Sequence, residues 1–250
     1  MQIEGATVLV TGANGDIGQY YMKALQAAKP AKIYAAARKL ESLSEIVAAD
    51  PDRIIPVELD ITDPESVAAA AKKCSETALL INNAGIGLLK TFISEEDISG
   101  ARKEIDVNYL GTLSMCRAFA PILKKNGGGA IVNMLSILGK MNFPMNASYS
   151  ASKAAELSMT QGIRMELQEQ GTLVIGVMPG TVDTEGSGHF PPPKVSPEVV
   201  VKDTLQAVVD EVEDVYPGDQ AKMMIKQLKE DPKALENEMA KMVSSSNESS

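Results

Sequence analysis

The stretch "TVLVTGANGDIG" (residues 7–18) joins a short apolar run to a cluster of glycines and then to a helical segment. Gly12, Gly15 and Gly18 permit a tight turn and a close approach of the backbone to a ligand. The free amides at the start of the following helix suit the pyrophosphate of a dinucleotide. A glycine-rich turn without a ligand is the alternative, and the strand–turn–helix context favours the nucleotide site.

Short apolar runs alternate with helical stretches along the rest of the chain. We predict strands at 7–10, 32–37, 53–59, 78–81, 129–135 and 173–178, with 214–219 as a candidate last strand. This alternation favours parallel pairing through right-handed crossovers, and strands that are apolar throughout suit a sheet covered by helices on both faces. The predicted fold is an α/β, doubly wound parallel sheet. Pro56 in the third strand fits the order 3-2-1-4-5-6, in which that strand is an edge.

Helix signals follow the predicted strands. Helices are expected near 17–28, 41–49 and 147–169, from Pro197 behind the cap Ser196, and from Asp231 and Pro232 onward. Thr62 and Glu65 form a capping-box pattern, and Ser94 and Asp97 are predicted to open a helical region that continues to about 123. The last helix would carry Leu235, Met239 and Met242 on one face.

The domain prediction is a single unit over residues 1–243. The proline-rich stretch 185–197 is expected to be a stiff surface loop, and 244–250 a disordered tail. Met223 and Met224 are predicted to fill the core.

Composition limits the possible functions. The formal net charge of −9 argues against a nucleic-acid binder, and no apolar run approaches the length of about 18 residues that a membrane span needs. The first residues form a strand pattern rather than a signal peptide. Cys74 and Cys116 fit free thiols in a reducing cytosol, and the single histidine, His189, rules out a His-rich metal site. We expect a cytoplasmic protein with no metal, nucleic-acid or membrane partner.

The segment "YSASK" (149–153) places Tyr149 and Lys153 four residues apart, on one face of a helix. A nearby cation lowers the pKa of a tyrosine, and a tyrosine so placed can exchange a proton near neutral pH. An ordinary pair on a surface helix would show the same spacing.

Arg38 stands twenty residues after Gly18, near the end of the second predicted strand. An NAD site normally has Asp or Glu there to hold the ribose 2′-hydroxyl. A cation instead suits the 2′-phosphate of NADP, so NADPH is the expected cofactor and NAD the alternative. A solvated Arg38–Lys39 pair would have the same sequence, and Asp16 adds negative charge near the phosphates.

With these pieces the chain resembles the short-chain dehydrogenase/reductase family. The resemblance runs from residue 6 to about 184 and rests on "TGANGDIG" (11–18), "LDIT" (59–62), "NNAG" (82–85), "DVNYLGT" (106–112), Ser136, "YSASK" and "PGTVDT" (179–184). It implies a Rossmann-type NAD(P)-binding oxidoreductase that interconverts a carbonyl and an alcohol.

The resemblance also implies a role for each matching residue. Tyr149 would be the acid/base, Lys153 would lower its pKa and hold the nicotinamide ribose, Ser136 would hydrogen-bond the substrate oxygen, and Asn108 would bind a water that supplies protons through Lys153. The implied cofactor-binding residues are Gly12, Asn14, Gly15, Ile17, Gly18, Arg38, Asp60, Ile61, Asn82, Ala84, Gly85, Tyr149, Lys153, Pro179, Gly180, Val182 and Thr184. The stretch 185–197 would lie on the substrate side, where His189, Phe190, Met141 and Phe143 are candidate contacts.

One motif departs from the compact group of the family, which usually reads TGxxxGxG. The spacing of Gly12, Gly15 and Gly18 is that of the extended group that acts on nucleotide sugars, but too few residues follow 184 for that group's larger substrate domain. A nucleotide-sugar epimerase or dehydratase and a non-catalytic dinucleotide-binding regulator are therefore the alternatives. The family also implies a homodimer or homotetramer, paired through the regions 94–123 and 147–169.

Overall fold

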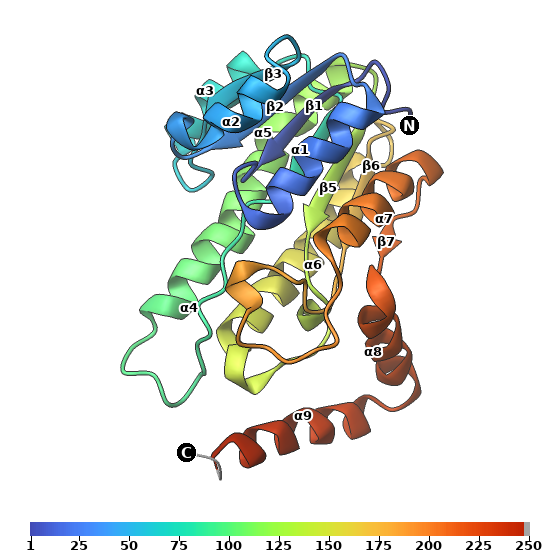
Figure 1. Cartoon of the computed structure of the whole chain (residues 1–250). Helices are drawn as coiled ribbons and strands as arrows, with labels where there is room; N and C mark the ends of the chain where they lie inside the picture. Colours follow the sequence, from blue (N-terminus) through green and yellow to red (C-terminus); the bar gives the residue numbers. More distant parts are fainter. Residues whose placement is uncertain (248–250) are drawn as a thin grey trace.

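The computed structural model describes residues 1–247, and within them seven strands form one parallel sheet in the order β3-β2-β1-β4-β5-β6-β7 (Figure 1). The strands are β1 (Thr7–Thr11), β2 (Lys32–Ala37), β3 (Ile54–Glu58), β4 (Leu79–Asn82), β5 (Ala130–Met134), β6 (Leu173–Val177) and β7 (Asp214–Val215). The predicted fold class is confirmed. Pro56 lies in β3 at the edge of the sheet, where its missing N–H costs no ladder bond.

Helices cover both faces of the sheet. They are α1 (Asp16–Ala28), α2 (Ser44–Ala49), α3 (Pro64–Lys73), α4 (Ser99–Glu104), α5 (Thr112–Lys125), α6 (Ala147–Leu167), α7 (Pro197–Asp210), α8 (Gly218–Glu230) and α9 (Pro232–Asn247). A π-helical segment, Ile105–Gly111, joins α4 to α5. Short 3-10 turns lie at Leu40–Leu43, Ile137–Gly139, Pro144–Asn146 and Glu185–Ser187.

The alternation of side chains along each strand divides the core into two layers. In β1, Val8 and Val10 pack with residues of α1 and α7, whereas Leu9 packs with residues of α3 and α5. Figure 1 shows α1 and α7 on one side of the sheet and α5 on the other. Because both faces are covered, the strand interiors are mostly apolar, as predicted, although Asn133 of β5 is a buried polar residue.

Two predicted helix starts are wrong. The cap of α3 is Asp63, whose carboxylate accepts a hydrogen bond from the Glu65 N–H, while Thr62 bonds instead to Asp60. The helical region predicted from Ser94 begins only at Ser99, whose N–H donates to the Asp97 carboxylate. In both places a side-chain bond to the backbone two residues on competes with the predicted cap.

The carboxyl-terminal helices differ most from the prediction. Helix α8 carries Met223 and Met224, and Met223 is 53% exposed, so these residues do not fill the core. Helix α9 continues to Asn247, so it extends into the first residues of the segment 244–250 that is predicted to be a disordered tail. Residues 248–250 of the predicted tail, and the side chain of Met242, lie outside the description. Within the described residues, no helix combines the length and apolarity needed to cross a bilayer.

Candidate active site

A cavity of about 1450 Å³ opens at the carboxyl ends of the central strands. The order of the strands reverses between β1 and β4, and in doubly wound sheets ligands bind at this switch point. The loops after β1, β2, β4, β5 and β6 all contribute residues to the wall. The motifs that are far apart in the sequence therefore meet in one cavity.

The glycine turn forms one end of this cavity. Gly12 has a φ of +63°, and a β-carbon there would lie 3.0 Å from the Cα of Ala84, so the position requires glycine. Gly15 and Asn14 line the cavity beside it. Gly18 does not line the cavity: a β-carbon there would collide with the backbone of Gly12, so its role is the packing of α1 against the turn.

Thr11 and Asn83 hold the turn in place, and the sequence analysis missed both. The Asn83 side-chain amide donates to the carbonyl oxygens of Thr11 and Gly12, each at 3.1 Å, and the Thr11 hydroxyl accepts from the N–H groups of Asn83 and Ala84. The neighbouring Asn82, predicted to face the cofactor, is buried and donates to the Asn133 carboxamide oxygen at 2.9 Å. Successive residues of an extended segment point to opposite sides. Asn83 therefore reaches the glycine turn, and the preceding residue Asn82 points into the core.

Charged side chains gather at the end of β2. Arg38 is exposed and lines the cavity near Asp60 and Ile61. The Asp60 carboxylate accepts from the hydroxyl and the N–H of Thr62, and these bonds, with a smaller effect of Arg38, lower its pKa. Asp16 accepts from the Glu185 N–H at 3.1 Å and so connects the glycine turn to the loop 185–197.

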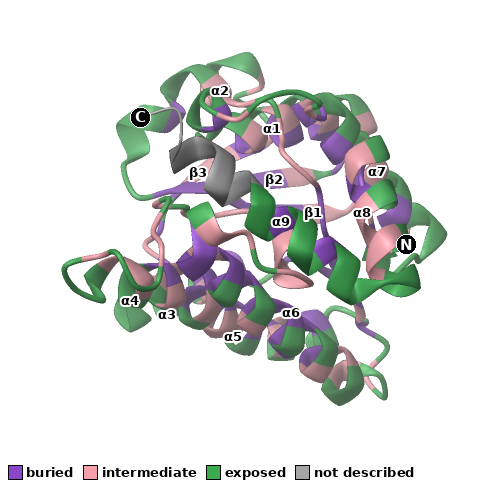
Figure 2. Cartoon of the chain, turned by 90° about the horizontal axis from the view of Figure 1, so that it is seen from below, coloured by how far each residue is buried: buried purple, intermediate pink, exposed green. Residues whose placement is uncertain are grey.

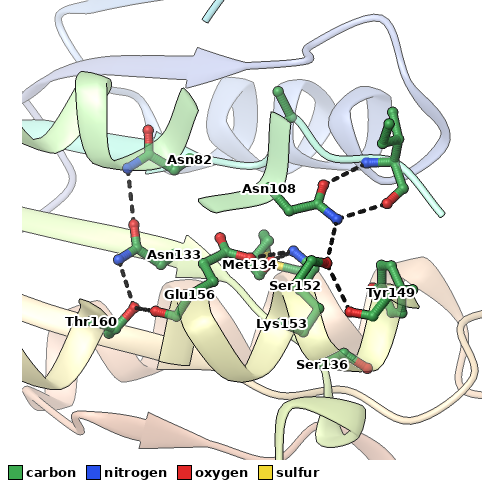
Figure 3. Close-up of polar contacts among 12 residues, drawn as sticks. Asn82, Asn108, Asn133, Met134, Ser136, Tyr149, Ser152, Lys153, Glu156 and Thr160 are labelled. Carbon is green, nitrogen blue, oxygen red and sulfur yellow. Dashed lines mark hydrogen bonds and ion pairs between the residues drawn. The ribbon is translucent and has the colours of Figure 1, made fainter. Parts of the chain in front are cut away.

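Ser136, Tyr149 and Lys153 line the middle of the cavity (Figure 3). Ser136 follows β5 and caps a 3-10 turn, where its hydroxyl accepts from the Leu138 N–H at 3.2 Å. Tyr149 and Lys153 lie one turn apart on α6, and the Lys153 Nζ is 5.8 Å from the centre of the Tyr149 ring. The structure thus brings together three of the four predicted catalytic residues at the cavity wall.

Lys153 makes a buried ion pair that the sequence analysis did not anticipate. Its Nζ donates to the Glu156 carboxylate at 2.6 Å and to the Met134 carbonyl oxygen at 2.7 Å. The side chains of Lys153 and Glu156 are only 5% and 2% exposed. Behind the pair, Asn82, Asn133 and Thr160 form a chain of hydrogen bonds that joins β4 and β5 to α6 (Figure 3).

Burial and attraction act in opposite directions on this pair. Burial alone would lower the pKa of Lys153, but the Glu156 carboxylate outweighs it and the pKa of Lys153 is raised. For Glu156, burial outweighs the attraction of Lys153 and its pKa is also raised. The raised pKa of Lys153 favours a charged pair, whereas the raised pKa of Glu156 favours a neutral carboxylic acid. We favour the charged pair because the Met134 carbonyl oxygen also stabilises the ammonium.

Lys153 lowers the pKa of Tyr149, as predicted, but this is not the largest effect on the phenol. Burial of the phenol raises this pKa, and the opposing effects of Lys153 and of the Ser136 hydroxyl are smaller. The Lys153 ammonium bonds to Glu156 and Met134 rather than to the phenol. The Tyr149 phenol is therefore neutral at physiological pH.

Asn108 does not line the cavity but lies in the π-helical segment behind it. Its carboxamide accepts from the Ile86 N–H and donates to the Ile86 carbonyl oxygen, both at 2.8 Å, and donates to the Ser152 hydroxyl at 2.9 Å. It therefore ties the loop after β4 to α6, next to Tyr149. π-helical turns often occur at functional sites.

Most of the remaining predicted residues line the cavity, and a few do not. Those that line the cavity are Gly12, Asn14, Gly15, Ile17, Arg38, Asp60, Ile61, Ala84, Gly85, Pro179, Gly180, Val182 and Thr184. Phe143 and Phe190 also line it, whereas Met141 and His189 do not; His189 stacks on Phe190 with ring centres 4.1 Å apart. Cys74 and Cys116 are buried free thiols, as predicted.

Residues 6–193 match the sequence model of the family described as short chain dehydrogenase. The chain therefore belongs to the short-chain dehydrogenase/reductase family, which confirms the resemblance inferred from its motifs. An NADP-dependent 3-hydroxy acid dehydrogenase of Schizosaccharomyces pombe is 31% identical over 196 residues, which cover 74% of this chain and 75% of that protein.

Solved structures agree with this assignment. A short chain dehydrogenase from Burkholderia cenocepacia in complex with NADP is 45% identical, has a TM-score of 0.91, and is matched over 96% of this chain and 99% of that chain. A short-chain dehydrogenase from Sphingobium yanoikuyae in complex with NADPH is 26% identical, with a TM-score of 0.77 and coverage of 92% and 94%. Both structures contain NADP or NADPH, the cofactor that is predicted from the position of Arg38.

Proposed function

We propose that this protein is an NADP-dependent oxidoreductase that interconverts a carbonyl compound and a secondary alcohol. The observation that carries the proposal is one cavity containing the Ser136–Tyr149–Lys153 cluster, the glycine turn and Arg38. The cradle at Gly12, where a β-carbon would press on Ala84, fits a dinucleotide pyrophosphate that approaches the backbone closely. The NADP complex of the Burkholderia cenocepacia relative supports the choice of cofactor.

In the direction of reduction, the bound nicotinamide would supply a hydride to the carbonyl carbon. Negative charge then develops on the carbonyl oxygen. The Ser136 hydroxyl is placed to donate a hydrogen bond to that oxygen, and the Tyr149 hydroxyl to transfer its proton to it. Lys153, as an ammonium, stabilises the phenolate that remains. Oxidation of the alcohol uses the same groups in reverse.

Proton supply to Tyr149 would pass between Asn108 and Lys153. The two donors of the Asn108 amide are in use, but its oxygen accepts only one bond and retains capacity for a water. Gly85 leaves this region open, because a β-carbon there would lie 3.2 Å from the Asn108 Oδ1 and 3.7 Å from the Lys153 Nζ. These contacts support the proposed relay through a water bound by Asn108.

A panel of ketones and alcohols, followed at the nicotinamide absorbance, tests the proposed function. We expect oxidation of NADPH that depends on added ketone. A non-catalytic regulator would bind NADPH without consuming it, and a nucleotide-sugar epimerase or dehydratase would convert its substrate with no net change in the cofactor. Either result would contradict the proposal.

Arg38 is expected to make the enzyme prefer NADPH over NADH by roughly ten- to a hundredfold in kcat/KM. A guanidinium can hold a phosphate through two charge-assisted hydrogen bonds, such bonds contribute about 1.5–3 kcal/mol, and about 1.4 kcal/mol corresponds to a factor of ten. The double variant Ala37→Asp/Arg38→Ala should reverse the preference, because it adds a carboxylate that repels the phosphate. The measurement compares both cofactors at fixed ionic strength, with Lys39→Ala as the control.

An Arg38→Ala variant that keeps the full preference for NADPH would contradict this assignment of the cofactor pocket. The fold and the catalytic cluster would be unaffected by that result.

We also propose that the protein forms a homodimer or homotetramer through the helices of regions 94–123 and 147–169. Leu110 in the first region is 44% exposed, and Met165 in the second is 71% exposed. Light scattering at micromolar concentration should give a mass of two or four times the 26.6 kDa of the chain. A monomer mass would contradict the proposal.

A further inference from the structure

The substrate side of the cavity has an apolar wall. Phe143, from the segment before α6, and Phe190, from the loop 185–197, lie with ring centres 6.3 Å apart. Met223 and Met224 of α8 and Leu235 and Met239 of α9 continue the wall. Methionine adapts its flexible side chain to irregular apolar ligands, so a wall of this composition suits a bulky hydrocarbon group.

Helix α9 contributes to this wall from an unusual place. It lies beyond the ends of the strands, across the lower part of the molecule (Figure 1), and Figure 2 shows it crossing in front of β1. Leu235 and Met239 are only 3% and 6% exposed, yet neither belongs to the two layers of apolar core that cover the sheet. Their burial comes from facing the cavity and the turn Pro144–Asn146, on which α9 packs.

Helices α8 and α9 also lie outside residues 6–193, the part of the chain that matches the family. Gln220 of α8 accepts a hydrogen bond from the Thr181 N–H at 2.7 Å, which fixes α8 to the loop after β6. The part of the apolar wall that α8 and α9 form is therefore attached to the loop after β6 but lies beyond the matched family region.

The charges around this wall disfavour an anionic substrate. Among the described residues that line the cavity, the cations are Arg38, Lys103 and Lys153. Arg38 lies at the far end of β2, and Lys153 is paired with Glu156. Lys103 lies on α4, across the molecule from α8 (Figure 1), and Asp106 follows it by three residues. The charged residue that α8 and α9 bring to the wall is Glu238, an exposed residue of α9.

We infer that the substrate is an uncharged, apolar ketone, or the corresponding secondary alcohol, with a chain or ring long enough to reach Met239. A substrate carboxylate would meet Glu238, and the described residues of α8 and α9 that line the cavity include no cation, so oxo acids are disfavoured. This inference rests on the proposed carbonyl–alcohol chemistry and adds the class of substrate.

The first test measures kcat/KM with NADPH along the series from 2-butanone to 2-nonanone. Each CH₂ group that becomes buried should raise kcat/KM by up to about fourfold, the equivalent of about 0.8 kcal/mol. A matched pair, 4-phenyl-2-butanone and 4-(3-oxobutyl)benzoate, differs only in a carboxylate. The neutral member should be preferred by at least about tenfold.

The second test changes the wall. Glu238→Lys should raise kcat/KM for the benzoate relative to the neutral ketone by about tenfold, because it exchanges repulsion for attraction. Glu236→Lys makes the same change of charge on an exposed position of α9 that does not line the cavity, and it should leave the ratio close to that of the wild type. Met239→Asn should flatten the dependence on chain length, whereas Met239→Leu should preserve it.

The outcomes separate this inference from the proposed function. Equal or better turnover of the benzoate, or a flat chain-length series in the wild type, would overturn the substrate class while the carbonyl reductase activity stands. A failure to oxidise NADPH with any of these ketones, in protein that binds NADPH, would overturn both. A rising series together with a Glu238-dependent preference would support the inference.

Discussion

Replacing Tyr149 with phenylalanine should lower kcat for ketone reduction by roughly 10²–10⁴, the usual contribution of a positioned acid. In the proposed function the phenol protonates the carbonyl oxygen, and the substitution removes only its hydroxyl. Because burial raises the pKa of Tyr149, the phenol remains protonated and able to donate at physiological pH. The measurement is kcat at saturating NADPH and ketone, together with the dissociation constant of NADPH, which should change little.

Tyr20→Phe is the matched control for this variant. Tyr20 lies on α1, away from the cavity, so the loss of its hydroxyl should leave kcat close to the wild-type value. A Tyr149→Phe protein that binds NADPH and keeps wild-type turnover would contradict the assigned role of Tyr149.

Replacing Glu156 with leucine should lower the free energy of unfolding by about 3–5 kcal/mol, the usual cost of removing one partner from a buried ion pair. The variant leaves the Lys153 ammonium buried with the Met134 carbonyl oxygen as its other acceptor. Urea unfolding followed by circular dichroism measures the loss. Glu156→Gln, which keeps a carboxamide oxygen at this position, should lose less.

The double variant Lys153→Met/Glu156→Leu gives the control, because it removes both charges and keeps similar volumes. It should be more stable than Glu156→Leu alone. The pKa of Lys153 is raised in the folded state, so the stabilisation from the pair is present below the ordinary lysine value of 10.5 and is lost as the pH rises through the raised pKa. Wild-type stability of Glu156→Leu would show that the pair is not structurally important.

The sheet could be predicted from the sequence because its signals are local and repeat along the chain. The apolar runs, the glycine turn and the edge proline Pro56 each depend on a few adjacent residues, and together they specify strand order. The helix starts near Thr62 and Ser94 could not be predicted, because Asp60 and Asp97 each offer the backbone a competing hydrogen bond.

The candidate site could be predicted where a motif fixes the residue and not where burial decides its role. Glu156, three residues after Lys153, has the spacing of an ordinary surface pair. Only the structure shows that both side chains are buried and that the Lys153 ammonium bonds to the Met134 carbonyl oxygen of β5. A buried acid next to a family lysine has no distinct signature in one sequence.

The carboxyl-terminal methionines show a second limit of sequence reasoning. An apolar face on a helix indicates burial, but it does not distinguish a core from a cavity. Met223 and Met224 are predicted to fill the core, and they line the cavity instead. The contact between Gln220 and Thr181, which orients α8, joins positions too far apart for any local pattern.

The proposed hydride transfer from NADPH to a ketone is tested most directly with 4-phenyl-2-butanone and NADPH that carries deuterium at both C4 positions, with mass spectrometry of the products. We expect 4-phenyl-2-butanol with one deuterium on the carbinol carbon, formed in proportion to the NADPH consumed. Alcohol without that deuterium, or no alcohol from protein that binds NADPH, would contradict it.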